Sequence, residues 1–221
     1  SAQTVLELAT GRGANSAYLA EQSPDVKFSG IDLSPGQLDF AFKKAKILSN
    51  YSPQLGDYHD LSMYKNESFD IVFEVEALCY SLEKEKVLSE VNRVLKNDGL
   101  FILFDGYRGR EPESELEELS MQLVEKGMAL EVSEQYSSFR MKALEANFGI
   151  LKEEDLSMFV LPTMKRFEKL ANRFFKHWIL ARILSKILPS EIINNSVSGY
   201  LMPITVQKGL FTYQLTVLKK N

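Results

Sequence analysis

Continuous apolar runs alternate, in the first half of the chain, with stretches in which apolar residues recur every three or four positions. The continuous runs predict buried strands near residues 4–8, 26–32, 52–56, 69–74 and 99–105. The helical spacing predicts helices near residues 15–22, 35–48 and 84–95. Because strands and helices alternate, we expect a parallel sheet whose strands are joined by crossover helices.

The pattern changes after Asp105, where longer helical stretches begin. Residues 110–134 are rich in glutamate and form a predicted amphipathic helix, whereas residues 163–187 carry an apolar stripe interleaved with lysine and arginine. Residues 148–156 predict a sixth strand. Residues 210–218 alternate well and predict a last, antiparallel strand at or next to the edge of the sheet.

The composition indicates a single folded domain. The chain has 221 residues, of which 45% are hydrophobic and 11% aromatic, enough for a substantial core. We therefore expect one domain over residues 1–221, with helical lid elements at about 107–147 and 162–200. The net charge of -4 does not favour nucleic acid, which would need a local basic patch instead.

Cysteine usage and hydropathy narrow the setting. The single cysteine, Cys79, excludes a disulfide within the chain and any cysteine-based zinc cluster. Separately, no metal site is predicted. A lone cysteine fits the reducing cytoplasm, which is the predicted location. The sequence contains no apolar run of 18 residues and shows no signal-peptide pattern.

A glycine turn follows the first predicted strand. Gly11 and Gly13 let the backbone approach a ligand, and Asp32 follows 19 positions after Gly13, where it can accept ribose hydroxyls. The third glycine of the dinucleotide fingerprint is replaced by Ser16. Glu7 places an anion beside the turn, which suits a cationic ligand better than a pyrophosphate. S-adenosylmethionine (SAM) is such a ligand, because it carries a sulfonium and an ammonium group and no phosphate.

The glycine turn belongs to a series of motifs. Residues 7–13, Glu-Leu-Ala-Thr-Gly-Arg-Gly, resemble the first motif of class I SAM-dependent methyltransferases. Four further matches follow in the family's order, at Gly30–Ser34, Gly56–Asp57, Ser68–Phe73 and Arg93–Gly99. The resemblance covers residues 4–105 closely and the remainder loosely.

The resemblance implies the fold and the cofactor. The fold is α/β, a Rossmann-like seven-stranded, mostly parallel sheet with helices on both faces and a helical lid inserted after the fifth and sixth strands. The methyl donor is SAM, with S-adenosyl-L-homocysteine as the product. Family members also have helical sequence ahead of the first strand that covers the cofactor, and this sequence starts about four residues before that strand.

The resemblance also implies roles for residues around the methionine part and the ribose. Gly11 and Gly13 pass beneath these groups, and Glu7 organises the loop near the amino group. Asp32 binds the ribose diol through charge-assisted hydrogen bonds. The alternative for the glycines is an ordinary turn between a strand and a helix.

Four further residues complete the implied cofactor site. Leu33 covers one face of the adenine, Asp57 accepts a hydrogen bond from the adenine amino group, and the Tyr58 amide donates to the ring. Glu74, at the end of the fourth strand, borders the methyl-transfer centre. The alternatives are a turn aspartate for Asp57 and a solvated strand-end residue for Glu74.

Two local matches indicate a narrower group. Residues 75–80, Val-Glu-Ala-Leu-Cys-Tyr, resemble the Glu-Ala-Thr-Cys-His segment of sterol C-methyltransferases, with Leu78 and Tyr80 as departures. Residues 201–203 and 208–210 resemble the closing region of tocopherol methyltransferases. The chain is therefore most similar to the small-molecule sterol and tocopherol methyltransferases.

Methyl transfer from a sulfonium is an in-line displacement, so it depends mainly on positioning the nucleophile and excluding water. A base is needed only when the acceptor must lose a proton. The candidates are Glu76, His59 and Tyr80, which we expect on loops at the carboxyl edge of the sheet. Their structural alternatives are a helix cap for Glu76, a surface loop position for His59 and packing for Tyr80.

The predicted lid carries many large apolar side chains, which suit a small, hydrophobic or lipid-like acceptor. The alternative is that they form the lid's own core. They are Tyr107, Tyr136, Phe139, Met141, Phe159, Phe174, Phe175, Trp178 and Met202. The basic stripe has three interpretations: a solvated face, a partner for the glutamate-rich helix, or a surface for peripheral contact with anionic lipid.

The sequence therefore predicts a SAM-dependent methyltransferase with a small-molecule acceptor. A non-catalytic SAM- or nucleotide-binding module stays open as an alternative. A nucleic-acid methyltransferase is disfavoured, because Glu74–Ala77 stands where such enzymes carry an Asn-Pro-Pro-Tyr type segment. The oligomeric state and the methylated atom, carbon, nitrogen or oxygen, are left open.

Overall fold

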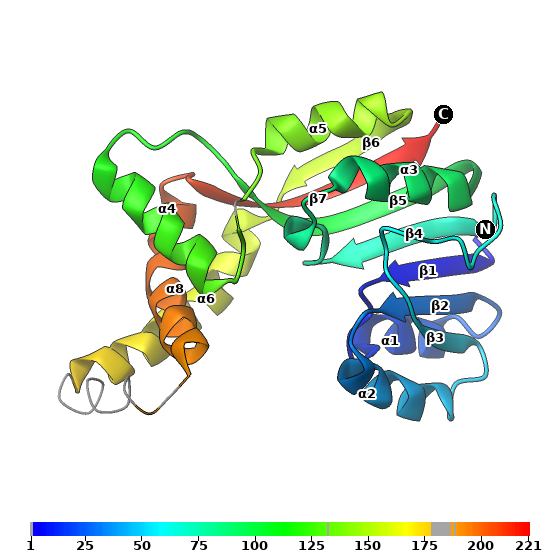
Figure 1. The fold of residues 1–221 in the computed structure, drawn as a ribbon, viewed down its shortest axis with the longest axis horizontal. Helices are drawn as coiled ribbons and strands as arrows, with labels where there is room; N and C mark the ends of the chain where they lie inside the picture. Colours follow the sequence, from blue (N-terminus) through cyan, green and yellow to red (C-terminus); the bar gives the residue numbers. More distant parts are fainter. Residues whose placement is uncertain (1, 132, 178–186, 188) are drawn as a thin grey trace. The chain divides into compact units, whose positions relative to one another are not determined.

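The chain forms a seven-stranded sheet with the strand order β3-β2-β1-β4-β5-β7-β6 (Figure 1). Strands β1 to β5 pair in parallel. The strands are β1 (Thr4–Leu8), β2 (Lys27–Asp32), β3 (Tyr51–Leu55), β4 (Phe69–Val75), β5 (Leu95–Arg108), β6 (Phe148–Asp155) and β7 (Phe211–Lys220). This is the predicted Rossmann-like sheet.

The computed structural model describes residues 2–131, 133–177, 187 and 189–221. Its α-helices are α1 (Ala14–Gln22), α2 (Pro35–Ala45), α3 (Lys84–Val94), α4 (Glu115–Gly127), α5 (Tyr136–Glu145), α6 (Ser157–Lys176) and α8 (Ser190–Gln207). A 3-10 turn, η1, spans Leu78–Tyr80. None of the helices in the described ranges is both long and apolar enough to cross a membrane.

The last strand runs antiparallel to its neighbours, as predicted. The Lys220 ammonium donates to the Leu95 carbonyl at 2.8 Å, and the Asn221 amide donates to the Asn147 carbonyl at 3.2 Å. The end of β7 therefore lies beside the beginnings of β5 and β6. Since β7 sits between these strands in the sheet, its position next to the edge is confirmed.

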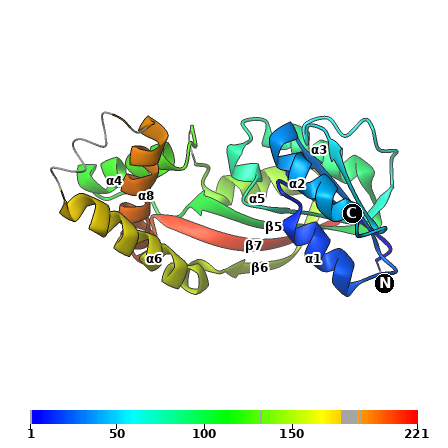
Figure 2. The same ribbon diagram turned by 90° about the horizontal axis from the view of Figure 1, so that it is seen from below.

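The contacts divide the chain into two compact units. The first comprises Ser1–Asp105, Ser137–Glu154 and Leu215–Asn221, and the second comprises Gly106–Tyr136 and Asp155–Gln214. The first unit holds the strands β1 to β4 and the glycine turn. The second holds α4, α6 and α8, in which α8 packs against both other helices (Figures 1 and 2).

One face of the sheet in the first unit is covered by α1 and α2. Ala17 and Ala20 of α1 and Leu38 and Ala41 of α2 form a buried cluster with strand side chains that include Phe28. An apolar groove of about 530 Å³ continues along α1 and this face. Helix α3 joins β4 to the parallel strand β5, and since such crossovers are right-handed as a rule, α3 belongs on the opposite face, in agreement with the predicted layering.

Helix positions in the second half of the chain differ from the prediction. Helix α6 begins at Ser157 rather than near residue 163, and α5 and α8 were not separately predicted. The glutamate-rich helix α4 starts at Glu115, where the Ser114 hydroxyl accepts a hydrogen bond from the Glu117 amide at 3.3 Å and caps it.

Candidate cofactor and active site

Three residues of the glycine turn adopt left-handed backbone conformations. The φ angles are 49° at Ala9, 54° at Gly11 and 68° at Gly13. A Cβ at Gly13 would lie 2.5 Å from the Tyr51 hydroxyl, whereas one at Gly11 would have no neighbour within 4 Å. Packing therefore requires glycine at position 13, and open space borders Gly11.

The buried Glu7 carboxylate holds the turn together. It accepts hydrogen bonds from the Thr10 hydroxyl at 2.5 Å, the Asn15 amide group at 2.9 Å and the Ser16 hydroxyl at 2.6 Å. Ser16, which stands where a dinucleotide site has its third glycine, is thus a structural partner of Glu7. Glu7 therefore holds the loop together through these contacts, and its place near the amino group of SAM stays a prediction.

Tyr51 supports the same network from β3. Its hydroxyl lies 3.0 Å from the Thr10 hydroxyl, and burial raises the pKa of Tyr51 to about 12. The neutral phenol packs beneath Gly13. Tyr51 was not among the predicted site residues, because only the folded turn brings it to Thr10.

Asp32 lies at the end of β2 and faces the turn. Its Oδ2 accepts from the Gly11 amide and its Oδ1 from the Ser34 amide, each at 2.8 Å. A carboxylate oxygen has two acceptor positions, so each oxygen can accept a further hydrogen bond. The adjacent Leu33 side chain is 62% exposed, so its apolar surface is open to contact with a ligand.

Asp57 and His59 form a polar chain beside this position. Asp57 Oδ1 accepts from the His59 amide at 2.8 Å and lies 2.7 Å from the His59 ring Nδ1. His59 Nε2 lies 2.8 Å from the Ser81 hydroxyl. Burial raises the pKa of Asp57, but the hydrogen bonds from His59 outweigh burial and hold this pKa below its ordinary value.

Tyr58 connects this loop to the segment after β4. Its hydroxyl donates to the Ala77 carbonyl at 3.3 Å, and its ring lies 4.6 Å from the His59 ring between centroids. Burial raises the pKa of Tyr58 to about 12, so the phenol stays protonated.

Two buried carboxyl groups hold the turn that follows β4. Glu74 Oε2 accepts from the Ala77 amide at 2.8 Å and the Leu78 amide at 3.3 Å. Asp105 of β5 accepts from the Cys79 amide at 2.6 Å. Burial, and then the nearby Asp105 carboxylate, raise the pKa of Glu74 well above its ordinary value. Asp105 was not predicted.

A family model described as a methyltransferase domain matches residues 1–159, which include the turn, Asp32, Asp57 and Glu74. The chain belongs to the class I SAM-dependent methyltransferase family. The predicted family is thereby confirmed, and so is the fold that it implied.

Among curated relatives, the methyltransferase domain is 33% identical over 105 residues to sterol methyltransferase-like 3 of Botryococcus braunii, covering 46% of this chain and 26% of that protein. It is 27% identical over 161 residues to 24-methylenesterol C-methyltransferase 3 of Arabidopsis thaliana, covering 70% of this chain and 44% of that protein. The chain thus spans less than half the length of either relative.

Among solved structures, the methyltransferase domain resembles geranyl diphosphate C-methyltransferase from Streptomyces coelicolor A3(2), a complex with Mg²⁺, geranyl diphosphate and S-adenosyl-L-homocysteine. The TM-score is 0.76 at 15% identity, covering 99% of this chain and 73% of the other. At this identity the likeness shows the shared fold alone.

The residues of the methyltransferase domain fit an adenosine-containing cation. Open space borders Gly11, Asp32 retains acceptor positions toward a diol, and Leu33 is exposed beside it. No group of three or more histidine, cysteine, aspartate or glutamate side chains in the described part of the chain is placed to hold a metal ion.

The three candidate bases lie in different settings. Glu76 is exposed, with a left-handed φ of 56°, and its amide donates to the Phe104 carbonyl at 2.8 Å. The Tyr80 side chain is half exposed, and the burial of its other half raises its pKa. Both ring nitrogens of His59 already have partners, so accepting a substrate proton would require one of these contacts to break.

Several of the expected lid side chains belong to hydrophobic cores instead. Tyr107 and Phe139 are fully buried, and Met202 packs against the core cluster of the second unit. Phe159 and Met141 are exposed, and Trp178 lies outside the described residues. The aromatic content of the lid region therefore reflects packing in part.

Proposed function

We propose that this protein is a SAM-dependent methyltransferase that acts on a small, hydrophobic acceptor. The observation that carries the proposal is the junction of Gly11 and Asp32, where an open backbone turn meets a carboxylate with acceptor positions to spare. The matching family model and the five ordered motifs support the methyltransferase part of this proposal.

We assign the cofactor contacts by these positions. Gly11 and Gly13 form the floor of the site, with the loop held by Glu7, and Asp32 accepts the ribose hydroxyls. Leu33 covers the adenine. Of the two carboxylate oxygens of Asp57, Oδ1 is engaged by His59, which leaves Oδ2 to accept from the adenine amino group.

The Tyr58 amide and Glu74 complete the proposed cofactor site. The Tyr58 side chain is anchored on Ala77, which orients its backbone for contact with the adenine ring. Glu74 closes the inner end of the site beside β1, since Glu74 pairs with Leu8 in the sheet.

SAM supplies an electrophilic methyl group, which the acceptor takes in an in-line displacement. The protein's task is then to align the acceptor and to exclude water. Glu74 and Asp105 fix the turn that carries Glu76 and Tyr80, so both candidate bases are presented from a rigid segment. Glu76 is the more suitable acceptor of a proton, because the raised pKa of Tyr80 keeps the phenol protonated.

The hydrophobic character of the acceptor is supported by names and by shape. Relatives are named for sterols and a structural neighbour for geranyl diphosphate. The second unit contains a hollow of about 680 Å³ lined by Phe175, Tyr200 and Leu201 among others. We further propose peripheral membrane contact, and a cytoplasmic location, which the single cysteine supports.

The cofactor site is tested by replacing Asp32 with alanine. SAM affinity measured by isothermal titration should fall at least about tenfold, or about 1.4 kcal/mol. The matched control is Asp39→Ala, which removes an exposed carboxylate from α2. Unchanged SAM binding by a folded Asp32→Ala variant would refute the assignment.

The reaction is tested by incubating the protein with isotopically labelled SAM and metabolite extracts. Label should appear in an organic-soluble product, and the product identifies both the acceptor and the methylated atom. Tight SAM binding without transfer to any component would favour a non-catalytic SAM-binding module.

A further inference from the structure

Helix α6 concentrates positive charge in a chain whose net charge is -4. Its 20 residues include five lysine or arginine residues and one acidic residue, Glu168. The basic residues are Lys165, Arg166, Lys169, Arg173 and Lys176. None of the five forms an ion pair or hydrogen bond with another residue in the described ranges. Their charge is therefore available to a partner outside the chain.

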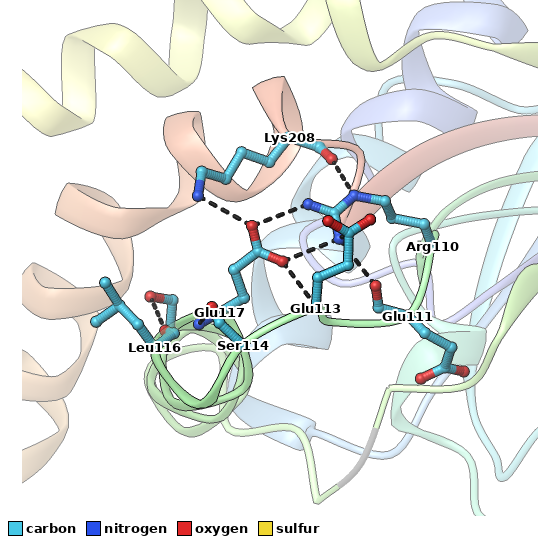
Figure 3. A network of polar contacts seen from close by, with 8 residues as sticks. Arg110, Glu111, Glu113, Ser114, Leu116, Glu117 and Lys208 are labelled. Carbon is cyan, nitrogen blue, oxygen red and sulfur yellow. Dashed lines mark hydrogen bonds and ion pairs between the residues drawn. The ribbon is translucent and has the colours of Figure 1, made fainter.

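The glutamate-rich helix α4 does not neutralise these cations. Glu117 receives two hydrogen bonds from Arg110, both at 2.9 Å, and one from Lys208 at 2.9 Å (Figure 3). Glu125 pairs with Arg108 at 2.7 Å. The interpretation of the basic stripe as a partner for the glutamate-rich helix is therefore wrong for these residues.

The same helix exposes large apolar side chains. Phe159, Phe167 and Leu170 are 76%, 56% and 63% exposed. Phe159 and Leu170 lie about 20° apart around the helix axis and share one face, whereas Phe167 lies about 80° from Phe159, on the side next to Gly199 of α8. Leu161 and Met164 of the same helix are buried in the core cluster of the second unit. The face that carries Phe159 and Leu170 is thus not the face that packs into the second unit.

A hollow of about 680 Å³ adjoins the basic residues of α6. Arg173 and Lys176 line it together with the aromatic side chains Phe175 and Tyr200, whose ring centroids lie 6.2 Å apart. Cations beside an apolar hollow suit an amphiphile with an anionic end.

We propose that the outer face of α6 docks on membranes that contain anionic lipid. Exposed aromatic and aliphatic side chains insert at the headgroup boundary, and flanking lysine and arginine residues bind the lipid phosphates. The inference rests on the proposed function in one respect: a membrane is the source from which an apolar acceptor is collected. The charge complementarity itself does not depend on catalysis.

The test is co-sedimentation of the full chain with vesicles. Vesicles of phosphatidylcholine with about one third phosphatidylglycerol should bind the protein at least about tenfold more tightly than pure phosphatidylcholine vesicles, and salt should weaken the binding. Lys165→Gln with Lys169→Gln should reduce binding to the anionic vesicles, and Phe159→Ser with Leu170→Ser should reduce it by a separate route.

The matched control uses α2, which also exposes lysine beside phenylalanine. Lys43→Gln with Lys46→Gln removes the same charge from another surface and should leave vesicle binding unchanged. Circular dichroism and the thermal midpoint verify that each variant folds.

Four outcomes would overturn the proposal. These are equal binding to neutral and anionic vesicles, full binding by both α6 variants, binding of monomeric short-chain phosphatidylglycerol without vesicle binding, and binding of RNA in place of vesicles. SAM affinity is measured in parallel on the same samples. If the wild-type chain binds vesicles but does not bind SAM, the result counts against the proposed function alone, because vesicle binding needs no cofactor.

Discussion

Strand β4 carries one carboxyl group near each end, and the two differ in how completely they are hydrogen-bonded. Asp70 accepts hydrogen bonds from the Gln3 and Thr4 amides, each at 2.9 Å, and from the Lys96 ammonium at 2.9 Å. Glu74 uses Oε2 for two amides, while its buried Oε1 has no hydrogen-bond partner among the described residues.

The pKa values of the two groups move apart accordingly. Burial raises the pKa of Asp70, but the hydrogen bonds from Lys96, Gln3 and Thr4 outweigh it and hold this pKa well below its ordinary range. Burial and the Asp105 carboxylate raise the pKa of Glu74. At the amino end of β4 the carboxylate of Asp70 is thus fully hydrogen-bonded. At the carboxyl end, the edge at which open α/β sheets bind ligands, Oε1 of Glu74 has no hydrogen-bond partner among the described residues.

The largest expected effect comes from removing the hydrogen bonds of Asp70, at the amino end of β4. Asp70→Ala removes the partner of two amides and an ammonium, and it should lower the free energy of unfolding by about 3 kcal/mol in urea titrations. Asp25→Ala, at an exposed position, is the matched control and should change it by less than about 0.5 kcal/mol. Equal effects would show that Asp70 does not tie the strand ends together.

Acidity distinguishes the same residue in a second way. Since the pKa of Asp70 is lower in the folded state, its contribution is present above the unfolded value of 3.8 and is lost as pH falls toward the folded value. Asp70→Asn should therefore weaken the loss of stability below about pH 4, compared with the wild type.

A smaller effect should follow at the other end. Because the folded pKa of Glu74 is raised, its folded state holds a proton that the unfolded state releases above 4.5, so stability falls as pH rises toward the folded pKa. The limiting slope for one proton is about 1.4 kcal/mol per pH unit. Glutamine resembles the protonated acid, so Glu74→Gln should reduce the fall in the free energy of unfolding as pH rises. The measurement is a series of urea titrations across pH.

The expected pH dependence of stability is specific to Glu74. Replacing Glu83, an exposed residue ahead of α3, with glutamine should leave the free energy of unfolding falling with pH as steeply as in the wild type. A Glu74→Gln variant that loses stability with rising pH at the wild-type rate would show that Glu74 is ionised in the folded protein.

The smallest effect concerns the coupling between the two buried carboxyl groups. Asp105→Asn keeps an oxygen that can accept from the Cys79 amide but removes the like charge. The pKa of Glu74 should drop. The fall in stability with rising pH that comes from Glu74 should then end at a pH lower by about one unit or less. An unchanged end point would mean that burial alone sets the pKa of Glu74.

The sequence was sufficient to single out the residues that we propose bind the cofactor. Glycines, a strand-end aspartate and an acidic residue in the first strand have fixed spacings, so Gly11, Asp32 and Glu7 were found by pattern. Ala9 was missed, because alanine gives no signal for the left-handed conformation that it adopts. Asp105 was missed because its role depends on the alignment of β5 with the turn after β4.

Helix α8 escaped separate prediction for a physical reason. Its sequence contains asparagine, serine, glycine and an internal proline, Pro203, which individually disfavour a helix. Packing against α4 and α6 supplies the missing stability. The roles of Glu76, His59 and Tyr80 stay predictions, since they depend on where an acceptor lies.

The contact between Asp105 and the Cys79 amide gives this chain a reporter of its own. Cys79 is the single cysteine, and burial together with Asp105 raises the pKa of its thiol. Alkylating reagents react with thiolate, so the closed turn protects this residue from them. The rate of labelling at Cys79 therefore measures how often the segment after β4 opens, without any knowledge of the acceptor.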